Sequence, residues 1–110
     1  MIPPPLGPSA VGGQEFSYVY VLQSRRTGRL YLGWTTDLRR RLCEHNDGLS
    51  RATRNRGPYE LVYYEAYKHR AEAIAREQSL KKHPNVWQQL KRRLHKTLAM
   101  ASAGAQEVVG

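Results

Sequence analysis

Three chemically capable side chains lie within fifteen residues of one another: the phenol of Tyr31, the guanidinium of Arg41 and the imidazole of His45. A guanidinium binds carboxylates and phosphates through paired N–H donors, and an imidazole gains or loses a proton near neutral pH. A phenol can orient water, and it can accept a proton from water where a metal and a cation lower its pKa from about 10. Together these groups indicate anion binding combined with proton transfer.

A strand followed by a helix would bring these groups together. The helix is expected to follow Thr35 or Thr36, either of which can act as its N-cap. Asp37 suits the positively polarised first turn. The helical pattern continues to about Asn46, and Gly48 can end it.

One face of this predicted helix carries both apolar and chemical side chains. Leu38 and Leu42 define the apolar stripe, and the i, i+3, i+4, i+7 pattern adds Arg41 and His45. We therefore expect both on or beside the buried face. Burial of an unpaired charge is costly, so Arg41 should have an anionic partner or an anionic substrate. For His45, a structural role and a role in a site both stay open.

The remaining elements make a small mixed fold. Three segments rich in aromatic and β-branched residues predict strands, at 16–22, 29–35 and 59–67. Gly28 favours a tight turn between the first two, and Pro84 separates two further predicted helices at 71–83 and 85–98. The fold class is α/β, of the α+β kind, with one small domain containing a sheet and about three helices.

The helix predicted at 71–83 has a carboxylate within its apolar stripe. Its apolar stripe is Ala73, Ile74 and Leu80, and Glu77 fills the missing position. A carboxylate in such a stripe needs a partner or a bound cation. Two hypotheses stay open: a buried salt bridge, for example to Arg41, and a ligand for a hard divalent cation whose shell is otherwise water and phosphate oxygen.

The charge of the chain favours a polyanionic partner. The net charge is +9, from 18 Lys and Arg against 9 Asp and Glu, and such an excess favours nucleic acid through counterion release. Glu44 and two arginines beside Arg41 are expected to point away from the buried face. The arginines expected to contact nucleic acid are Arg39, Arg40, Arg51, Arg54 and Arg56. A merely solvated basic surface is the alternative.

Other features limit the class of protein. The only cysteine is Cys43, which excludes an intrachain disulfide and a cysteine-based zinc site. We expect Cys43 to pack within the fold. No apolar run of about 18 residues and no signal-peptide pattern occurs, so a cytoplasmic protein without a membrane span is expected. Residues 1–14 and 99–110 are expected to be a disordered N-terminal tail and a flexible C-terminal tail around a domain at 15–98.

Two tripeptides on the first two predicted strands resemble a known motif. Tyr18-Val-Tyr20 and Tyr31-Leu-Gly33 resemble the paired strand signature of the GIY-YIG nuclease family. In the first, Tyr18-Val19 replaces Gly-Ile, and the second departs only by Leu for Ile. The resemblance extends to Arg41, His45 and Glu77 in the same order and covers about residues 16 to 85. It is closest to small stand-alone bacterial members, which are similar to the nuclease module of the excision-repair endonucleases.

The resemblance implies a fold and a function. The fold would be a three-stranded antiparallel sheet flanked by helices. The function would be endonuclease cleavage of phosphodiester bonds in DNA, possibly branched or damaged, in repair or processing. The reaction would use one divalent ion, Mg²⁺ or Mn²⁺, and no small-molecule cofactor. Gly33 would let backbone or substrate approach closely, whereas Trp34 stands where the excision-repair modules tend to carry lysine.

The resemblance also suggests roles for five residues. Glu77 would hold the metal against the phosphate, and Arg41 would bind the phosphate and offset developing charge. Tyr31 is slightly favoured over Tyr20 for activating water, with Tyr20 positioning water or phosphate. His45 could transfer a proton or contact phosphate.

Two other classes of function compete with the nuclease. One is a non-catalytic nucleic-acid-binding module on the same fold, which the altered first tripeptide allows. The other is a small basic protein associated with RNA or the ribosome. Pure binding does not need Glu77 on an apolar stripe. The RNA- or ribosome-associated class predicts no metal dependence and no loss of function in Glu77→Ala.

Overall fold

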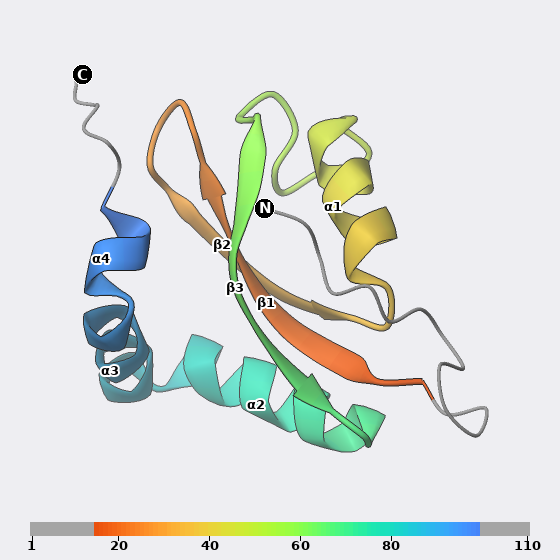
Figure 1. The fold of residues 1–110 in the computed structure, drawn as a ribbon, viewed down its shortest axis with the longest axis vertical. Helices are drawn as coiled ribbons and strands as arrows, with labels where there is room; N and C mark the ends of the chain where they lie inside the picture. Colours follow the sequence, from red (N-terminus) through yellow and green to blue (C-terminus); the bar gives the residue numbers. More distant parts are fainter. Residues whose placement is uncertain (1–14, 100–110) are drawn as a thin grey trace.

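The computed structural model describes residues 15–99, so the predicted tails lie outside the described part except for Ala99. Its elements, in chain order (Figure 1), are β1 (Ser17–Ser24), β2 (Leu30–Thr35), α1 (Leu38–Asn46), β3 (Tyr59–Tyr67), α2 (Arg70–Lys82), α3 (Pro84–Arg93) and α4 (His95–Leu98). The predicted α+β class is confirmed. No helix in this described range is long and apolar enough to cross a membrane.

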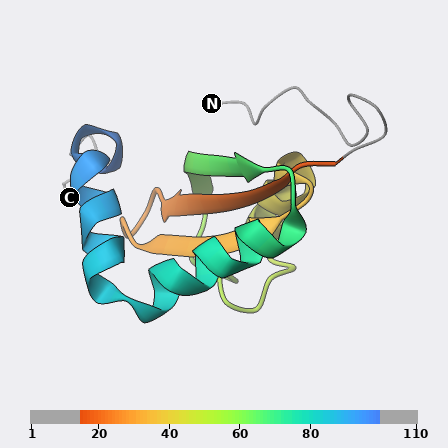
Figure 2. The ribbon, with the colours of Figure 1, turned by 90° about the horizontal axis from the view of Figure 1, so that it is seen from below.

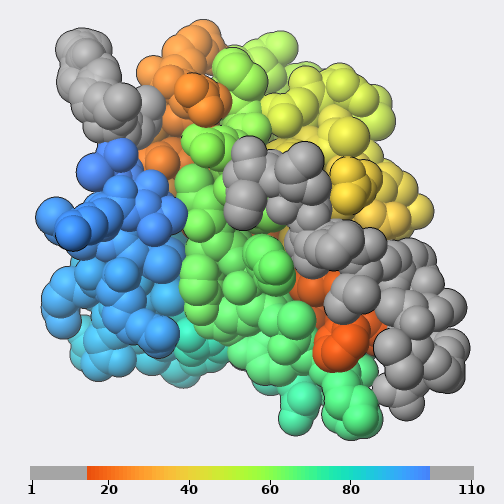
Figure 3. All heavy atoms as spheres, viewed as in Figure 1, coloured from red at the N-terminus to blue at the C-terminus, as the bar shows by residue number. Residues whose placement is uncertain are grey.

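The three strands form one antiparallel sheet in the order β2-β1-β3. Every residue of the central strand β1 is buried. Antiparallel pairing places Tyr20 directly opposite Gly33 of β2. On the face drawn in Figure 3, β3 lies at the surface between α1 and the α3–α4 pair. The long connection from α1 to β3 therefore brings a second strand against β1, as the resemblance implied.

Alternation along β1 divides the core into two layers. Tyr18, Tyr20 and Leu22 pack with Leu38 of α1 on one face of the sheet. Val19 packs with residues of α2 and α3 on the other face, namely Ala73, Leu80 and Leu90. Figure 2 shows α2 running along its face of the sheet. The helices α1 and α2 therefore cover opposite faces, and a site that uses both must form at the edge of the sheet.

The start of α1 differs from the prediction. Asp37, rather than Thr35 or Thr36, is the N-cap, and its side chain accepts a hydrogen bond of 3.0 Å from the backbone N–H of Arg40. The hydroxyl of Thr35 instead accepts from the backbone N–H of Asp37, at 3.1 Å. Asp37 has an extended backbone, as an N-cap residue requires, so the threonine prediction was wrong.

Two further expectations about the helices were wrong. The segment predicted as one helix at 85–98 is two, because the chain departs from helical geometry at Leu94 and α4 follows as a single short turn. Pro84 does not only end α2. It also occupies the first turn of α3, where a backbone N–H would have no hydrogen-bond partner within the helix.

The expectation that Cys43 packs within the fold was wrong. Cys43 is exposed, because it lies off the stripe that α1 turns toward the sheet.

Candidate active site

The site is built around Tyr20, whose side chain crosses from the central strand to the edge strand. Only 2% of Tyr20 is exposed. A Cβ atom placed on Gly33 would lie 2.5 Å from the Tyr20 hydroxyl oxygen and 2.7 Å from the adjacent ring carbon. Such distances are far below van der Waals contact, so only glycine fits opposite this phenol. Backbone or substrate was expected to approach Gly33, but the group that does so is the side chain of Tyr20.

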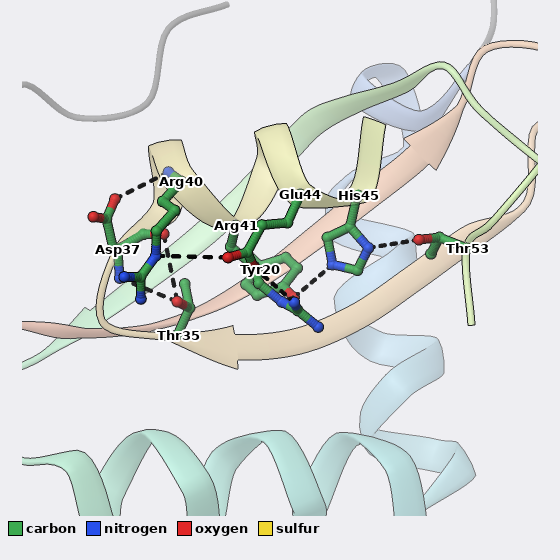
Figure 4. Close-up of polar contacts among 8 residues, drawn as sticks. All are labelled: Tyr20, Thr35, Asp37, Arg40, Arg41, Glu44, His45 and Thr53. Carbon is green, nitrogen blue, oxygen red and sulfur yellow. Dashed lines mark hydrogen bonds and ion pairs between the residues drawn. The ribbon is translucent and has the colours of Figure 1, made fainter. Parts of the chain in front are cut away.

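A chain of polar contacts runs through the Tyr20 hydroxyl (Figure 4). Arg41 Nε donates a hydrogen bond of 3.3 Å to it, and His45 Nε2 lies 3.0 Å away. On the far side of the imidazole, His45 Nδ1 lies 2.7 Å from the hydroxyl oxygen of Thr53. Arg41 and His45 are one turn apart on α1, which places both over the phenol, as the apolar stripe predicted.

His45 contacts protein groups at both ring nitrogens and is 2% exposed. Burial, with the positive charge of Arg41 as the second cause, lowers its pKa to about 4. The imidazole is therefore neutral at pH 7. The geometry directs it toward Tyr20 and leaves it no solvent-facing nitrogen.

The phenol also keeps its proton in the resting protein. Burial raises the pKa of Tyr20 to about 12, although Arg41 acts in the opposite direction. Burial raises the pKa of the phenol and lowers that of the imidazole, so transfer of a proton from Tyr20 to His45 is strongly unfavourable. Tyr20 is thus a neutral hydrogen-bonding group before any substrate arrives.

Arg41 has its anionic partner on its own helix. Its Nη1 lies 2.9 Å from Glu44 Oε1, and both side chains are about one-third exposed, at 33% and 32%. Glu44 was expected to point away from the buried face, but it is half-buried and pairs with Arg41. Residues three apart on a helix are neighbours, which explains the pairing. The hypothesis of a salt bridge from Arg41 to Glu77 was wrong, because within residues 15–99 Glu77 pairs with Lys81.

Tyr31 lies beside the same cluster with its hydroxyl available. Its ring centroid is 4.8 Å from that of His45 and 6.4 Å from that of Tyr20. Its side chain is half-buried. Within residues 15–99 its hydroxyl forms no hydrogen bond, whereas that of Tyr20 is held by two side chains. Tyr31 can therefore offer both a donor and an acceptor to a ligand.

Glu77 approaches the cluster from the other helix. In Figure 4, α2 passes along β2 on the side away from α1. Glu77 is 9% exposed, and its Oε2 lies 2.6 Å from Lys81 Nζ. Its charge contributes to the raised pKa of Tyr20, after the larger effects of burial and Tyr31. The carboxylate therefore acts on the same phenol that Arg41 contacts.

One oxygen of Glu77 remains without a protein partner. No hydrogen bond or ion pair within residues 15–99 uses Oε1. The described residues also contain no group of three or more His, Cys, Asp and Glu side chains that could hold a metal ion by themselves. A metal here would therefore take at most two of its ligands from such side chains, with water and substrate oxygens as the others.

The arginines predicted to contact nucleic acid are all exposed: Arg39, Arg40, Arg51, Arg54 and Arg56. Two of them also brace their own loop, since Arg54 donates to the carbonyl of Gly48 at 3.1 Å and Arg56 to that of Ala52 at 3.3 Å. This loop borders a hollow of about 580 Å³ whose wall includes His45 and Thr53.

A family model described as the GIY-YIG catalytic domain matches residues 16–91. The chain belongs to the GIY-YIG family. Among GIY-YIG relatives, a UPF0213 protein of Clostridium perfringens is 43% identical over 67 residues, covering 60% of this chain and 71% of that protein. A UPF0213 protein of Haloquadratum walsbyi is 40% identical over 68 residues, covering 61% and 75%.

A solved structure is also similar to this GIY-YIG chain. The solution NMR structure of a UPF0213 protein from Bacillus halodurans matches with a TM-score of 0.44 and 28% identity, over 84% of this chain and 96% of that chain. The predicted resemblance to small stand-alone members of the family is confirmed by the family model and the UPF0213 relatives. Family membership indicates a nuclease-type catalytic domain.

The GIY-YIG site contains two residues that sequence reasoning missed. Glu44 holds Arg41, and its spacing of three residues on a helix was a usable signal. Thr53 holds His45 from the loop after α1. No periodic pattern in that loop marks Thr53, so only the folded chain reveals it.

Proposed function

We propose that this GIY-YIG protein is a metal-dependent endonuclease that hydrolyses phosphodiester bonds in DNA. The observation that carries the proposal is the convergence on one phenol: Arg41 donates to Tyr20, His45 contacts it, and the charge of Glu77 acts on it from the opposite helix. A fold that only bound nucleic acid would not need a nearly buried carboxylate whose charge acts on this phenol.

The residues present fit a divalent metal. Glu77 offers a hard carboxylate oxygen, Oε1, that is nearly buried and has no partner within the described residues. Mg²⁺ is commonly held by one or two carboxylates together with water and substrate phosphate. We expect Mg²⁺ or Mn²⁺ at Glu77, where the bound ion would act as a Lewis acid on the scissile phosphate.

The chain's own groups would orient the reaction. Arg41, one-third exposed, would bind a non-bridging phosphate oxygen through Nη2, the guanidinium nitrogen that Tyr20 and Glu44 do not use. The free hydroxyl of Tyr31 would hold the attacking water in line with the leaving oxygen. His45 would keep the Tyr20 hydroxyl in place through its hydrogen bond.

The partner follows from the charge. With a net charge of +9 and exposed arginines on α1 and on the loop after it, the protein would bind the DNA backbone through phosphate contacts. Those contacts carry no base code, so we propose selection by DNA structure, such as branches or damage. Repair or processing of DNA in the cytoplasm is the setting that we propose.

A specific observation supports the second candidate, a non-catalytic nucleic-acid-binding module. Lys81 Nζ lies 2.6 Å from Glu77, so the carboxylate is already neutralised by a cation. The altered tripeptide Tyr18-Val-Tyr20 also favours the non-catalytic module. In this alternative the phenol cluster would serve only to hold α1 on the sheet.

Incubation with branched, nicked and plain duplex DNA, with Mg²⁺ or Mn²⁺ and with chelator, separates the two. We expect cleavage that Glu77→Ala and Arg41→Ala abolish while DNA binding, measured by fluorescence anisotropy, survives in Glu77→Ala. Glu72→Ala, an exposed position on the same helix, is the matched control and should cleave normally. Absence of cleavage of every DNA with either metal would favour the binding module.

A further inference from the structure

The most completely bonded carboxylate of the described residues lies outside the site. Glu65 of β3 accepts two hydrogen bonds at each oxygen. Oε1 accepts from Tyr67 Oη at 2.6 Å and Arg76 Nε at 3.0 Å, and Oε2 accepts from Tyr63 Oη at 2.7 Å and Arg76 Nη2 at 3.0 Å. Every acceptor position of the carboxylate is thus used. Glu65 has no position left for a metal or a substrate.

The hydrogen bonds between Glu65 and Arg76 form an ion pair that is largely shielded from solvent. The side chain of Glu65 is 15% exposed and that of Arg76 is 28% exposed. Burial alone would raise the pKa of Glu65, but hydrogen bonds from Arg76, Tyr67 and Tyr63 outweigh it and lower the pKa. A paired fork of guanidinium N–H groups on a carboxylate fixes orientation as well as distance. This contact therefore defines how α2 sits against β3.

Arg76 immediately precedes Glu77. Successive residues of an α-helix point about 100° apart, so α2 can hold β3 with Arg76 while Glu77 points in another direction, from which its charge acts on Tyr20. The buried apolar contacts of α2 on either side are Ala73 and Leu80, and alanine offers little surface with which to resist rotation. The fork on Glu65 is the contact best placed to set the rotation of α2.

Small rotations of α2 about its axis would displace the carboxylate of Glu77. A carboxylate at the end of a glutamate side chain lies about 6 Å from the helix axis, so a rotation of about 10° moves it by about 1 Å. A misplacement of about 1 Å can reduce the rate of a catalysed reaction about 100-fold. The position of Glu77 is therefore sensitive to any loosening of the Arg76 contact.

We propose that Glu65 and Arg76, braced by Tyr63 and Tyr67, are positioning residues that set the orientation of Glu77 toward its divalent metal. This inference rests on the proposed function, because it needs Glu77 to be the metal ligand. Neither residue touches substrate or metal. They act through the rotation of α2, in the way that outer groups fix the ligands of metal sites.

Three variants test the clamp formed by Glu65 and Arg76. Arg76→Lys keeps the charge and loses the fork, and Glu65→Gln keeps the shape and loses the charge. Tyr67→Phe removes one brace and leaves the ion pair, so it supplies a folded variant if either of the others is unstable. Glu60→Gln is the matched control, since Glu60 on the same strand makes a single exposed contact of 3.2 Å with Arg25.

The decisive readout is Mn²⁺ binding by the full chain, followed by electron paramagnetic resonance below the melting temperature of each variant. We expect Arg76→Lys and Glu65→Gln to weaken Mn²⁺ binding about 10-fold to 100-fold, and Tyr67→Phe to weaken it less. In cleavage assays the loss should lie in kcat, with KM for DNA unchanged. Glu60→Gln should match the wild type in both.

Two different results would overturn the inference. If the wild type binds Mn²⁺ in a Glu77-dependent way and the folded clamp variants bind it equally well, the clamp is only structural and the proposed function stands. If the wild type does not bind Mn²⁺ at Glu77, the proposed function fails together with the clamp.

Discussion

Gly33→Ala should displace the phenol at the centre of the site. The added methyl group would lie 2.5 Å from the Tyr20 hydroxyl oxygen and 2.7 Å from its ring carbon Cζ. Tyr20 is 2% exposed and is held by His45 and Arg41, so its ring cannot move aside without breaking those contacts. Either the ring tilts or β2 moves away from β1.

The magnitude follows from the contacts that would be lost. Overpacking of a filled core costs about 1–3 kcal/mol, and loss of the neutral hydrogen bond between Tyr20 and His45 adds about 0.5–1.5 kcal/mol. We expect the free energy of unfolding to fall by about 2–4 kcal/mol in Gly33→Ala. In a domain of this size, each kcal/mol lowers Tm by about 4–8 °C.

Thermal denaturation followed by circular dichroism measures this loss, and a double-mutant cycle assigns it. In a Tyr20→Leu background the clashing ring is absent, so Gly33→Ala should cost much less than in the wild type. DNA cleavage by the single variant should also be lost. The predicted clash is refuted if Gly33→Ala has the same Tm as the wild type. It is also refuted if Gly33→Ala lowers the free energy of unfolding by the same amount in both backgrounds.

Three other perturbations probe the same site. The pKa of His45 is lowered from 6.5 to about 4, so its contribution to the free energy of unfolding should be complete above pH 6.5. As the pH falls from 6.5 through 4, the free energy of unfolding should decrease by up to about 3 kcal/mol. Urea titrations should find a smaller decrease in His45→Asn. Lys81→Met should tighten Mn²⁺ binding at Glu77 up to about fivefold, because the side chain of Lys81 is 50% exposed and such a pair is worth at most about 1 kcal/mol; weaker binding in a titration would contradict this. Tyr31→Phe should lower kcat at least about tenfold with unchanged DNA affinity, and an unchanged kcat would remove Tyr31 from the reaction.

Local patterns were sufficient to predict most of the fold. The strand at Tyr59–Tyr67 has the predicted limits, and the stripe of α1 placed Arg41 and His45 over the sheet, because periodicity reports which face is buried. The N-cap was wrong because Thr35, Thr36 and Asp37 are all good caps, and the sequence does not say which has the extended backbone.

The partners within the site could not be predicted in the same way. Glu77 was expected to pair with Arg41 or with a metal, but α1 and α2 cover opposite faces of the sheet, and the nearest cation is Lys81 on the same helix. The contact of Thr53 with His45 depends on how the loop after α1 folds back. The pair of Glu77 with Lys81 is local and has the i,i+4 spacing of a helix. The faces that α1 and α2 cover and the fold of the loop are long-range features, which periodicity does not encode.

The most direct test of the central claim is cleavage of branched DNA by the wild-type protein in Mg²⁺, after chelation, and after Mg²⁺ is restored. The structure leads us to expect cleavage that stops with chelator and returns with the metal, because Glu77 Oε1 is the nearly buried oxygen available to hold it. DNA that stays intact throughout, or cleavage that chelator does not affect, would contradict a metal-dependent nuclease.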